Sequence, residues 1–491
     1  MPTDGPVQLG NHERAIYVLG TARDAAKQIV KQYVGPAVAR RRPTRTDLPL
    51  DLWGLRIGRN QRLWHGSIDL HELAERFGSP LHVVDGARLG AAANDALAPC
   101  REGAGADIFY SYKTNPVPAV LRRLHAAGIG AEVISAYELW LAFELGVPAD
   151  RIIYNGPAKS PESIELAIRR GVHLVNANSL SELRTIVEIA ERCATTVRLG
   201  LRVSFPGMWG GQFGIDAEST QVDEAIRVAQ QSDVVDLVGV HVHRGGTMRG
   251  EGEWQWHVST VLDFCAGVTE RTGWSPTVLD VGGSLACPTS AGIGDRDYRL
   301  HRALGTDLIP PDPATAISIA QASRSATAMA AEHFGDRGCV VPAVVQEPGR
   351  ALTGGSQMLL TRVLDVKDDV EPHHLVLDGG RNIADPLPHE YHQLFSVSKP
   401  SEPAARPYRL VGPICTPADV LYYHWALPNA AVGDVVAVMD AGAYFVPFST
   451  SFSFPRPPIV VIDGDDVVLA RTAESFDDLT ALDRAAEERP R

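Results

Sequence analysis

The sequence predicts an α/β protein with a closed (β/α)₈ barrel of the TIM type, followed by an all-β domain. From about residue 80 to residue 338, short apolar runs alternate with amphipathic runs that end at glycine, which is typical of parallel strands covered by helices. The alternation extends over about 255 residues, the usual size of one barrel. Beyond residue 339 the apolar runs follow one another without helices, which indicates a separate β domain.

The residues before the barrel form two segments. Residues 1–50 are expected to be an appendage, with a helix over His12–Ala39 and a basic, proline-broken linker at Arg40–Arg45. Residues 51–79 are expected to contribute to the β domain, and a helix fits Asp69–Phe77.

Residues 80–338 are predicted to hold the barrel strands and the helices between them. The strands are Leu81–Val84, Ile108–Tyr112, Ala131–Ile134, Ile152–Tyr154, His173–Asn176, Val197–Val203, Leu237–His243 and Thr277–Val281. The helices are Val117–Ala127, Ala136–Leu145, Pro161–Arg170, Leu180–Arg192, Glu253–Thr272 and Ala314–Phe334. A doubly wound open sheet is the alternative, although no Gly-x-Gly-x-x-Gly follows the first strand.

Residues 339–473 are predicted to form the C-terminal β domain, because turn residues separate its apolar runs. Its expected strands are Val341–Val345, Met358–Val366, His374–Leu377, Tyr408–Val411, Asp434–Met439, Ile459–Ile462 and Val467–Ala470. Residues 474–491 are expected to be an acidic tail.

Composition excludes several classes of function. The formal net charge of -13 argues against a nucleic-acid partner, which calls for a clustered basic surface. No apolar run approaches the length of a membrane span, and the N-terminus lacks a basic region followed by an apolar core, so we expect a cytoplasmic protein without a membrane partner. The six cysteines include no Cys-x-x-Cys pair, which predicts neither a disulfide framework nor a metal site.

Residues with useful chemistry lie at the ends of predicted strands, where barrels bind their ligands. They are Lys113, His241, His243, the pairs Gly245–Gly246 and Gly282–Gly283, Glu347 and Arg350. Each has a plain structural interpretation, such as a surface lysine, a core histidine or a simple turn. Together, a lysine for a Schiff base, backbone N–H groups for a phosphate, a stacking partner and a carboxylate fit one ligand, pyridoxal 5′-phosphate.

Six motifs resemble, in the same order, those of the fold-type III pyridoxal-phosphate decarboxylases, which include diaminopimelate and eukaryotic-type ornithine decarboxylases. The motifs are Tyr110–Asn115, Val240–Gly246, Leu279–Gly283, Glu347–Arg350, Gly412–Cys415 and Asp440–Tyr444, within a resemblance that covers residues 60–472. It implies an alanine-racemase-like barrel with a C-terminal β domain and a lyase of amino-acid metabolism. Residues 1–50 remain outside it.

The resemblance implies a role for each matching residue. Lys113 would hold the cofactor as a Schiff base, and His243 would lie against one face of its ring. Glu347 would lie at the pyridine nitrogen, where a carboxylate favours the protonated ring and therefore decarboxylation over racemisation. Gly282 and Gly283 would receive the phosphate, with Arg350 and Tyr444 adding charge and a hydroxyl. Gly245, Gly246 and Gly349 would also belong to the cofactor site.

Cys415 matches the family cysteine that returns a proton to Cα from the β domain of the partner subunit. Lys113 can also donate this proton. The resemblance therefore implies a homodimer whose active sites are shared across the interface.

The residues that would contact the substrate depart from the family pattern. Thr416 stands where a carboxylate reads a distal ammonium, and Asp419 is kept. A hydroxyl in that place forgoes a charge-assisted hydrogen bond, about 1.5–3 kcal/mol of recognition. Asp385 lies near the usual place of an arginine, while Tyr391 is expected in a different pocket wall and Arg350 beside the substrate.

These departures predict a decarboxylase for a non-standard amino acid, such as an acylated, modified or carrier-linked one from a specialised biosynthetic pathway. Two alternatives stay open: a racemase or other Cα chemistry on the same scaffold, and a non-catalytic cofactor-binding regulator. The presence of Lys113, Glu347 and Cys415 argues against the regulator.

Overall fold

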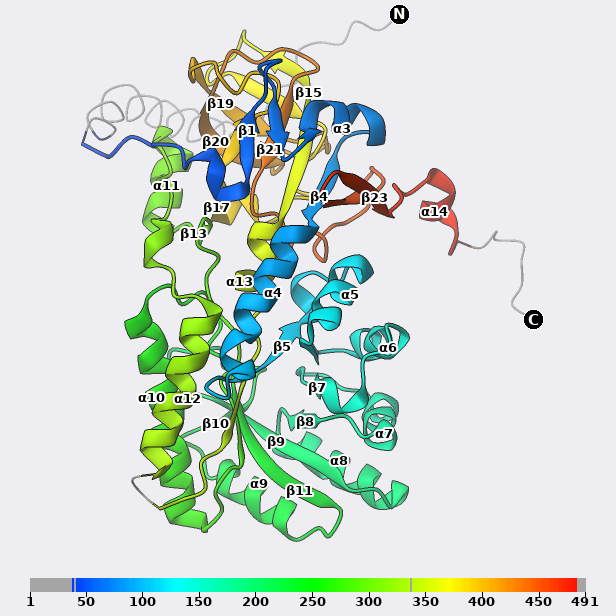
Figure 1. Cartoon of the computed structure of the whole chain (residues 1–491), viewed down its shortest axis with the longest axis vertical. Coiled ribbons are helices and arrows are strands. Elements are labelled where there is room, and N and C mark those ends of the chain that lie inside the picture. The colour runs from blue at the N-terminus through cyan, green and yellow to red at the C-terminus, as the bar shows by residue number, and fades with distance from the viewer. Residues whose placement is uncertain (1–37, 39–40, 336–337, 484–491) are drawn as a thin grey trace, which may run out of the picture.

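The structure is a computed structural model that describes residues 38, 41–335 and 338–483. The helix expected over residues 12–39 and the end of the acidic tail therefore lie outside the described residues, apart from residue 38. Figure 1 shows two parts stacked along the long axis, the barrel with its helices and a β-rich part at the N-terminal end of helix α4. Among the described residues, no helix is long and apolar enough to cross a membrane.

Eight parallel strands close the barrel in the described part of the chain. Around the ring they are β5 (Asp107–Ser111), β6 (Gly130–Val133), β7 (Ile152–Tyr154), β8 (Leu174–Ala177), β9 (Val197–Ser204), β11 (Val235–Val242), β12 (Val278–Asp280) and β14 (Ala343–Gln346). Pairing of β14 with β5 and of β8 with β9 completes the ring. A separate small cluster of apolar side chains, to which Phe109, Leu174 and Val278 belong, comes from six of these strands.

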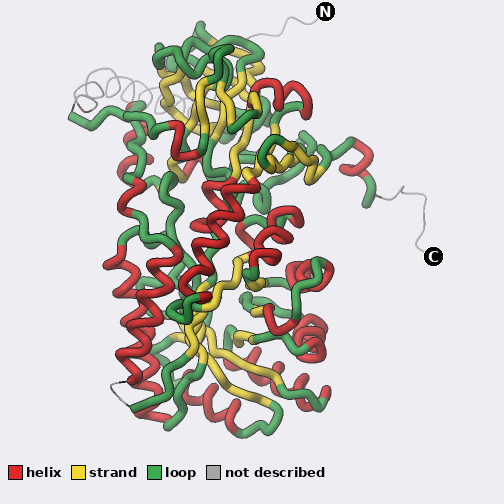
Figure 2. The backbone as a smooth tube through the Cα atoms, viewed as in Figure 1, coloured by secondary structure: helices red, strands yellow, loops and turns green. Residues whose placement is uncertain are grey.

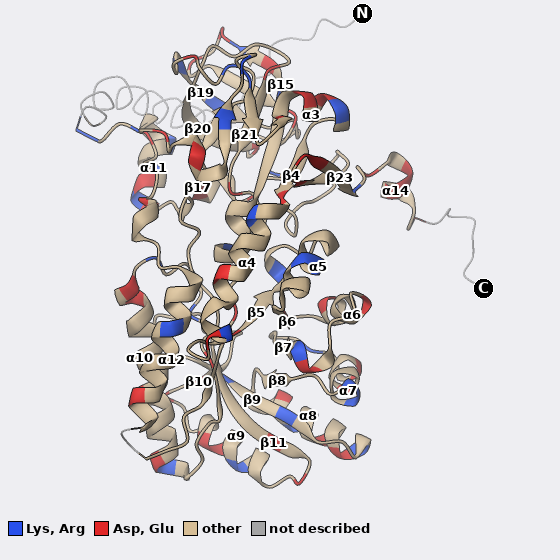
Figure 3. Cartoon of the chain, in the orientation of Figure 1, with Lys and Arg blue, Asp and Glu red and all other residues tan. Residues whose placement is uncertain are grey.

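Helices surround the barrel, as the outer ring in Figure 2 shows. They are α4 (Gly86–Arg101), α5 (Pro118–Ala127), α6 (Ala136–Glu144), α7 (Pro161–Arg170), α8 (Leu180–Cys193), α9 (Gln221–Gln230), α10 (Glu251–Thr272) and α12 (Ile319–Gly335). Serines cap three of them, since Ser135, Ser160 and Ser179 each accept a backbone N–H of the first turn. The outer helices carry charged residues of both signs along the ribbon, as Figure 3 shows.

The β domain is built on a mixed sheet. Its strands are β4 (Leu81–Asp85), β15 (Gln357–Lys367), β16 (His374–Leu377), β18 (Leu394–Ser396), β19 (Arg406–Val411), β20 (Val420–Leu427), β21 (Val435–Val438), β22 (Ile459–Asp463) and β23 (Asp466–Arg471). A small sheet of β1 (Leu55–Ile57), β2 (Leu63–His65) and β3 (Ile68–Asp69), together with α3 (Leu70–Phe77), packs on it. The Leu63 N–H donates to the Val397 carbonyl at 3.0 Å.

The expected first barrel strand is wrong, and so is the expected first strand of the β domain. Strand β4 pairs with β15 and β22 in the β domain, whereas β14 closes the barrel between β12 and β5. The barrel sheet therefore extends from residue 107 to residue 346, and the predicted boundaries at residues 80 and 338 do not follow it. Both strands are short and largely apolar, so either fits a sheet that is buried on both faces.

Two short elements join the domains near the carboxyl ends of the barrel strands. Strand β13 (Ala291–Gly292), in the loop after β12, pairs antiparallel with β17 (Glu390–Tyr391) of the β domain. Helix α13 (Arg350–Thr353) follows β14, and α11 (Asp295–Leu304) and α14 (Phe476–Thr480) complete the described helices. The pairing of β13 with β17 brings residues of both domains to one face of the barrel.

Candidate active site

A cavity of about 1270 Å³ lies at the carboxyl ends of the barrel strands, against the β domain. Lys113 follows β5, His243 follows β11 and Glu347 follows β14, so parallel strands deliver all three side chains to one edge. Arg350 and Tyr444 line the same cavity. The structure thus brings together five residues that the sequence analysis took from four separate motifs.

Lys113 lies in a strongly acidic environment. Burial lowers the pKa of its ammonium, but the nearby Glu132, Tyr444 and Glu347 more than compensate, so this pKa lies above its ordinary value. The backbone of the neighbouring Thr114 accepts the Tyr444 N–H at 2.9 Å. Lys113 therefore carries a proton that it must release before its amine can act as a nucleophile.

Glu347 is a buried carboxylate with partners on both oxygens. Asn155 donates its side-chain N–H to Oε1 at 2.6 Å, and Oε2 lies 3.4 Å from His241 Nε2 and 3.8 Å from His243 Nδ1. Burial raises the pKa of Glu347, but the two histidines and Asp280 outweigh it, so the pKa lies well below the ordinary value. Burial and the Glu347 charge raise the pKa of Asp280 well above its ordinary value, which keeps the proton of this pair on Asp280.

The ring of His243 is neutral. Burial lowers its pKa to about 3, against the opposing effect of Glu347. Ser284 Oγ lies 3.2 Å from its Nε2, and the Trp209 ring centroid lies 5.7 Å from its own. His241, His243 and Glu347 form a compact group, because the carboxylate contacts both imidazoles. The ring nitrogens and the carboxylate oxygen that could bind a metal ion lie within 4.8 Å of one another.

The glycine pair Gly282–Gly283 does not line the cavity. Gly282 has φ of 66°, and its N–H donates to Asp280 Oδ1 at 2.9 Å rather than toward the cavity. A Cβ on Gly283 would lie 2.1 Å from the Glu347 carbonyl oxygen. The pair is thus required for close packing of the β12 turn against β14. The expected phosphate contact through Gly282 and Gly283 stays a prediction. Gly246 lines the cavity, whereas Gly245 packs against Trp209.

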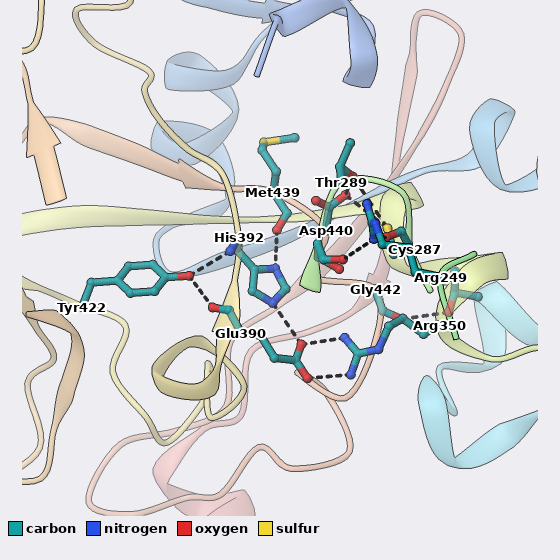
Figure 4. A network of polar contacts seen from close by, with 12 residues as sticks. Arg249, Cys287, Thr289, Arg350, Glu390, His392, Tyr422, Met439, Asp440 and Gly442 are labelled. Carbon is teal, nitrogen blue, oxygen red and sulfur yellow. Dashed lines mark hydrogen bonds and ion pairs between the residues drawn. The ribbon is translucent and has the colours of Figure 1, made fainter. Parts of the chain in front are cut away.

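Arg350 is paired with a residue that the sequence analysis missed. Its two terminal nitrogens donate to the two carboxylate oxygens of Glu390, each at 2.6 Å (Figure 4). His392 Nε2 lies 3.3 Å from Glu390 Oε2, and the guanidinium carbon lies 5.1 Å from the Tyr444 ring centroid. Burial raises the pKa of Glu390, but the opposing effects of His392 and Arg350 are larger and lower this pKa to about 2.

Of the expected substrate contacts in the β domain, the structure places Asp385 in the cavity wall but not Tyr391. Asp385 accepts a hydrogen bond from Arg381 at 2.7 Å. Tyr391 is buried in the β-domain core, where its hydroxyl donates to Gln393 at 2.7 Å. The reason is the alternation of side chains along β17, since Glu390 faces the cavity and the next residue faces the opposite side.

Cys415, Thr416 and Asp419 do not line the cavity of the described chain. Cys415 is exposed, on the loop before β20. Asp419 is buried, and its two oxygens accept the backbone N–H groups of Arg381 and Ile414 at 2.8 and 2.9 Å. Within one chain, Asp419 therefore fixes the loop that carries Cys415, instead of facing a substrate.

Sequence analysis also missed Glu132, whose charge acts on Lys113, and Asn155, which links Glu132 to Glu347. Ser111 Oγ donates to Glu132 Oε2 at 2.5 Å, and Asn155 donates to Glu132 Oε1 at 3.0 Å and to Glu347 at 2.6 Å. Burial raises the pKa of Glu132 above its ordinary value. The available signal was a carboxylate inside the otherwise apolar run of β6, all of which is buried.

Comparisons with known proteins agree on one family. A family model described as pyridoxal-dependent decarboxylase, pyridoxal binding domain, matches residues 93–354. The diaminopimelate decarboxylase of Archaeoglobus fulgidus is 31% identical over 434 residues, which cover 86% of this chain and 96% of that relative. The diaminopimelate decarboxylase of Methanocaldococcus jannaschii is 28% identical over 441 residues, covering 86% of this chain and 95% of the relative. Its crystal structure superposes with a TM-score of 0.76 at 26% identity, covering 88% of this chain and 98% of the other.

Proposed function

The chain belongs to the pyridoxal-dependent decarboxylases, and from this premise we propose that it removes the α-carboxylate of an amino acid with a non-standard or modified side chain. It is an amino-acid decarboxylase whose cofactor is pyridoxal 5′-phosphate. One observation carries the proposal of the substrate. The cavity combines Lys113, His243 and Glu347 at the barrel with Asp385 at the β domain, near the usual place of an arginine in the family.

The residues present fit the cofactor. Lys113 offers an amine, the neutral imidazole of His243 offers a flat face, and Glu347 offers an ionised carboxylate, all from strand ends around one cavity. Gly246 and Tyr444 also line it, so backbone N–H and hydroxyl donors for a phosphate are available. When bound, the cofactor supplies an aldehyde carbon for amines and an electron-withdrawing ring.

The side chains of this protein hold and move protons around that group. Glu347, fixed by Asn155 and His241, keeps a negative charge where a protonated ring nitrogen would lie, which favours loss of carbon dioxide. Asn155 also ties Glu347 to Glu132, so both carboxylates keep their places near Lys113. The Lys113 ammonium would release its proton before the amine binds the cofactor. Lys113 can later return a proton to Cα of the substrate.

Cys415 is the second proposed proton donor, and it acts from the other subunit of a homodimer. Its exposure on the loop before β20, and the fact that it does not line the cavity of its own chain, support this role. Asp419 holds that loop through two backbone N–H groups. Thr416 would then face the substrate from the partner with a hydroxyl instead of a carboxylate.

A screen for carbon dioxide release tests the proposed substrate class. Cofactor-loaded protein is incubated with meso-diaminopimelate, ornithine, lysine and arginine, and in parallel with Nε-acyl lysines, with Lys113→Ala as the blank. We expect release from an acylated or otherwise modified amino acid at a rate that the four unmodified ones do not approach. Turnover of any of the four with kcat/KM above about 10⁴ M⁻¹ s⁻¹, the lower end for efficient enzymes, would refute the non-standard substrate.

Decarboxylation of diaminopimelate is the second candidate function. The relatives that carry this name align with this chain over 95% and 96% of their own lengths. The same screen separates the two candidates, because meso-diaminopimelate is one of its substrates.

A further inference from the structure

Three charged side chains that line the cavity near β17, those of Arg350, Glu390 and Asp385, each take part in an ion pair. Arg350 donates through both terminal nitrogens to both oxygens of Glu390, at 2.6 Å each. Asp385 is paired with Arg381 at 2.7 Å. An incoming ligand therefore meets two closed ion pairs here, in which each charge already has its counter-charge.

Three contacts surround Glu390, so its ion pair with Arg350 is part of the folded framework of the domain. Its strand β17 pairs with β13, where Gly292 is its register partner. The Tyr422 hydroxyl donates to the Glu390 carbonyl at 2.7 Å. The His392 ring is fixed by donation from Nδ1 to the Met439 carbonyl, 2.9 Å away, because a carbonyl only accepts, and its Nε2 lies 3.3 Å from Glu390 Oε2 (Figure 4).

Two further arginines, Arg456 and Arg471, line the cavity on the β-domain side. Arg456 forms an ion pair with Glu474. Arg471 also lines the cavity, and among the described contacts its guanidinium donates to the Pro457 carbonyl at 3.4 Å. It lies on β23, which belongs to a different sheet from β17.

Aromatic side chains supply much of the remaining wall. Tyr137, Trp209 and Phe448 line the cavity and are about half exposed. His389 lines it as well and stacks at 5.6 Å on Tyr298. Such surfaces accept apolar, aromatic or amide groups without the desolvation that an unpaired charge would suffer.

We infer that Glu390 and Asp385 are specificity-determining residues that select an amino acid whose side chain ends in an uncharged group. This inference rests on the proposed decarboxylation and names the substrate class for it. A distal carboxylate would approach Arg350 only against the Glu390 charge. A distal ammonium near β17 would find Glu390 and Asp385 each already engaged by an arginine. A neutral end, such as an acyl amide or an aromatic ring, disturbs neither pair.

Binding of amines that cannot be decarboxylated tests the inference apart from the activity. Cofactor-loaded wild-type protein is titrated calorimetrically with N-acetyl-1,5-diaminopentane, 1,5-diaminopentane and 6-aminohexanoate, which share an amine and differ in the charge of the far end. We expect the neutral amine to bind at least tenfold more tightly than either charged one. Equal or tighter binding of a charged amine, or no binding of any, overturns the inference. Absence of carbon dioxide release from every amino acid would instead count against the proposed function.

Glu390→Gln tests the assigned residue, because it removes the negative charge and leaves Arg350 available. We expect its affinity for 6-aminohexanoate to rise at least tenfold, while binding of the acetylated amine changes less than threefold. Glu371→Gln is the matched control, since Glu371 is exposed, belongs to the same domain and does not line the cavity. Asp385→Asn gives a second variant should Glu390→Gln fail to fold, with the same expected gain. No gain in either variant overturns the assignment.

Discussion

The free energy with which His392 and Arg350 together stabilise the ionised Glu390 carboxylate can be worked out from the structure, and Glu390→Gln measures it. The surroundings lower the pKa of Glu390 from 4.5 to about 2, and its side chain is 19% exposed. A shift of this size corresponds to about 3 kcal/mol of stability at pH 7, at roughly 1.4 kcal/mol per pKa unit. Removal of one partner of a largely buried ion pair costs a similar amount, about 3–5 kcal/mol.

The sign of the pH dependence follows from the direction of the shift. Because the pKa is lower in the folded protein, the stabilisation is complete above the unfolded-state value of 4.5 and is lost as the pH falls toward 2. At pH 3 about 1.4 kcal/mol of the contribution remains, by the same linkage. The difference in stability between wild type and Glu390→Gln should therefore shrink to about half between pH 7 and pH 3.

Urea unfolding followed by tryptophan fluorescence measures this difference. Trp425 stacks on Tyr422 at 4.7 Å in the β-domain core and reports the domain in which Glu390 lies. Glu371→Gln, whose carboxylate is largely exposed, should change stability by less than about 0.5 kcal/mol. The reasoning is refuted if Glu390→Gln lies within about 0.5 kcal/mol of wild type at pH 7, or if its deficit does not narrow at pH 3.

Three further predictions concern the site. Lys113→Ala should abolish both carbon dioxide release and the visible absorbance of lysine-bound cofactor; absorbance equal to wild type would contradict the cofactor assignment. Lys113→Ala and Cys415→Ala subunits, mixed in equal amounts and reassociated, should regain about a quarter of wild-type activity above the residual activity of the Cys415→Ala protein if sites are shared, whereas no gain would contradict the shared site. Gly283→Ala should lower the free energy of unfolding in urea by at least about 2 kcal/mol, because the new Cβ would lie 2.1 Å from the Glu347 carbonyl oxygen. Gly250→Ala is the control: no atom lies within 4 Å of the Cβ position there, so its effect should be less than half as large.

Local sequence predicted the elements well where the signal was local. Helix α7 is found at the predicted residues, Pro161–Arg170, because a serine cap, a proline at its start and a final glycine mark its ends. Helix α4 was not predicted, because it is alanine-rich and contains Gly90 and Pro99, which mask its period. The exchange of β4 and β14 between sheets has another cause. Tertiary packing decides which strands a short apolar strand pairs with, and the sequence of the strand itself does not indicate them.

The same distinction applies to the site. Lys113, His243 and Glu347 were predictable because each directly follows a strand, and parallel strands bring their ends together. Glu390 was not, because its position depends on the two-residue strand β17 and on pairing with β13 in the other domain. A single step along that strand exchanges Glu390 in the cavity for Tyr391 in the core, so no local pattern decides between them.

Charged groups have different roles at the two ends of the cavity. Those near Lys113 hold protons for the reaction, and those at the β domain select the substrate side chain. Around Lys113, the carboxylates of Glu132, Asp280 and Glu347 share one buried network, in which the pKa values of two are raised and that of Glu347 is lowered. Such a network keeps protons available beside the reacting amine. At the β domain, Glu390 is ionised and fully engaged, so it has no proton to give at neutral pH. Its contribution is to cancel Arg350, and it therefore decides which side chains enter without taking part in the bond that breaks.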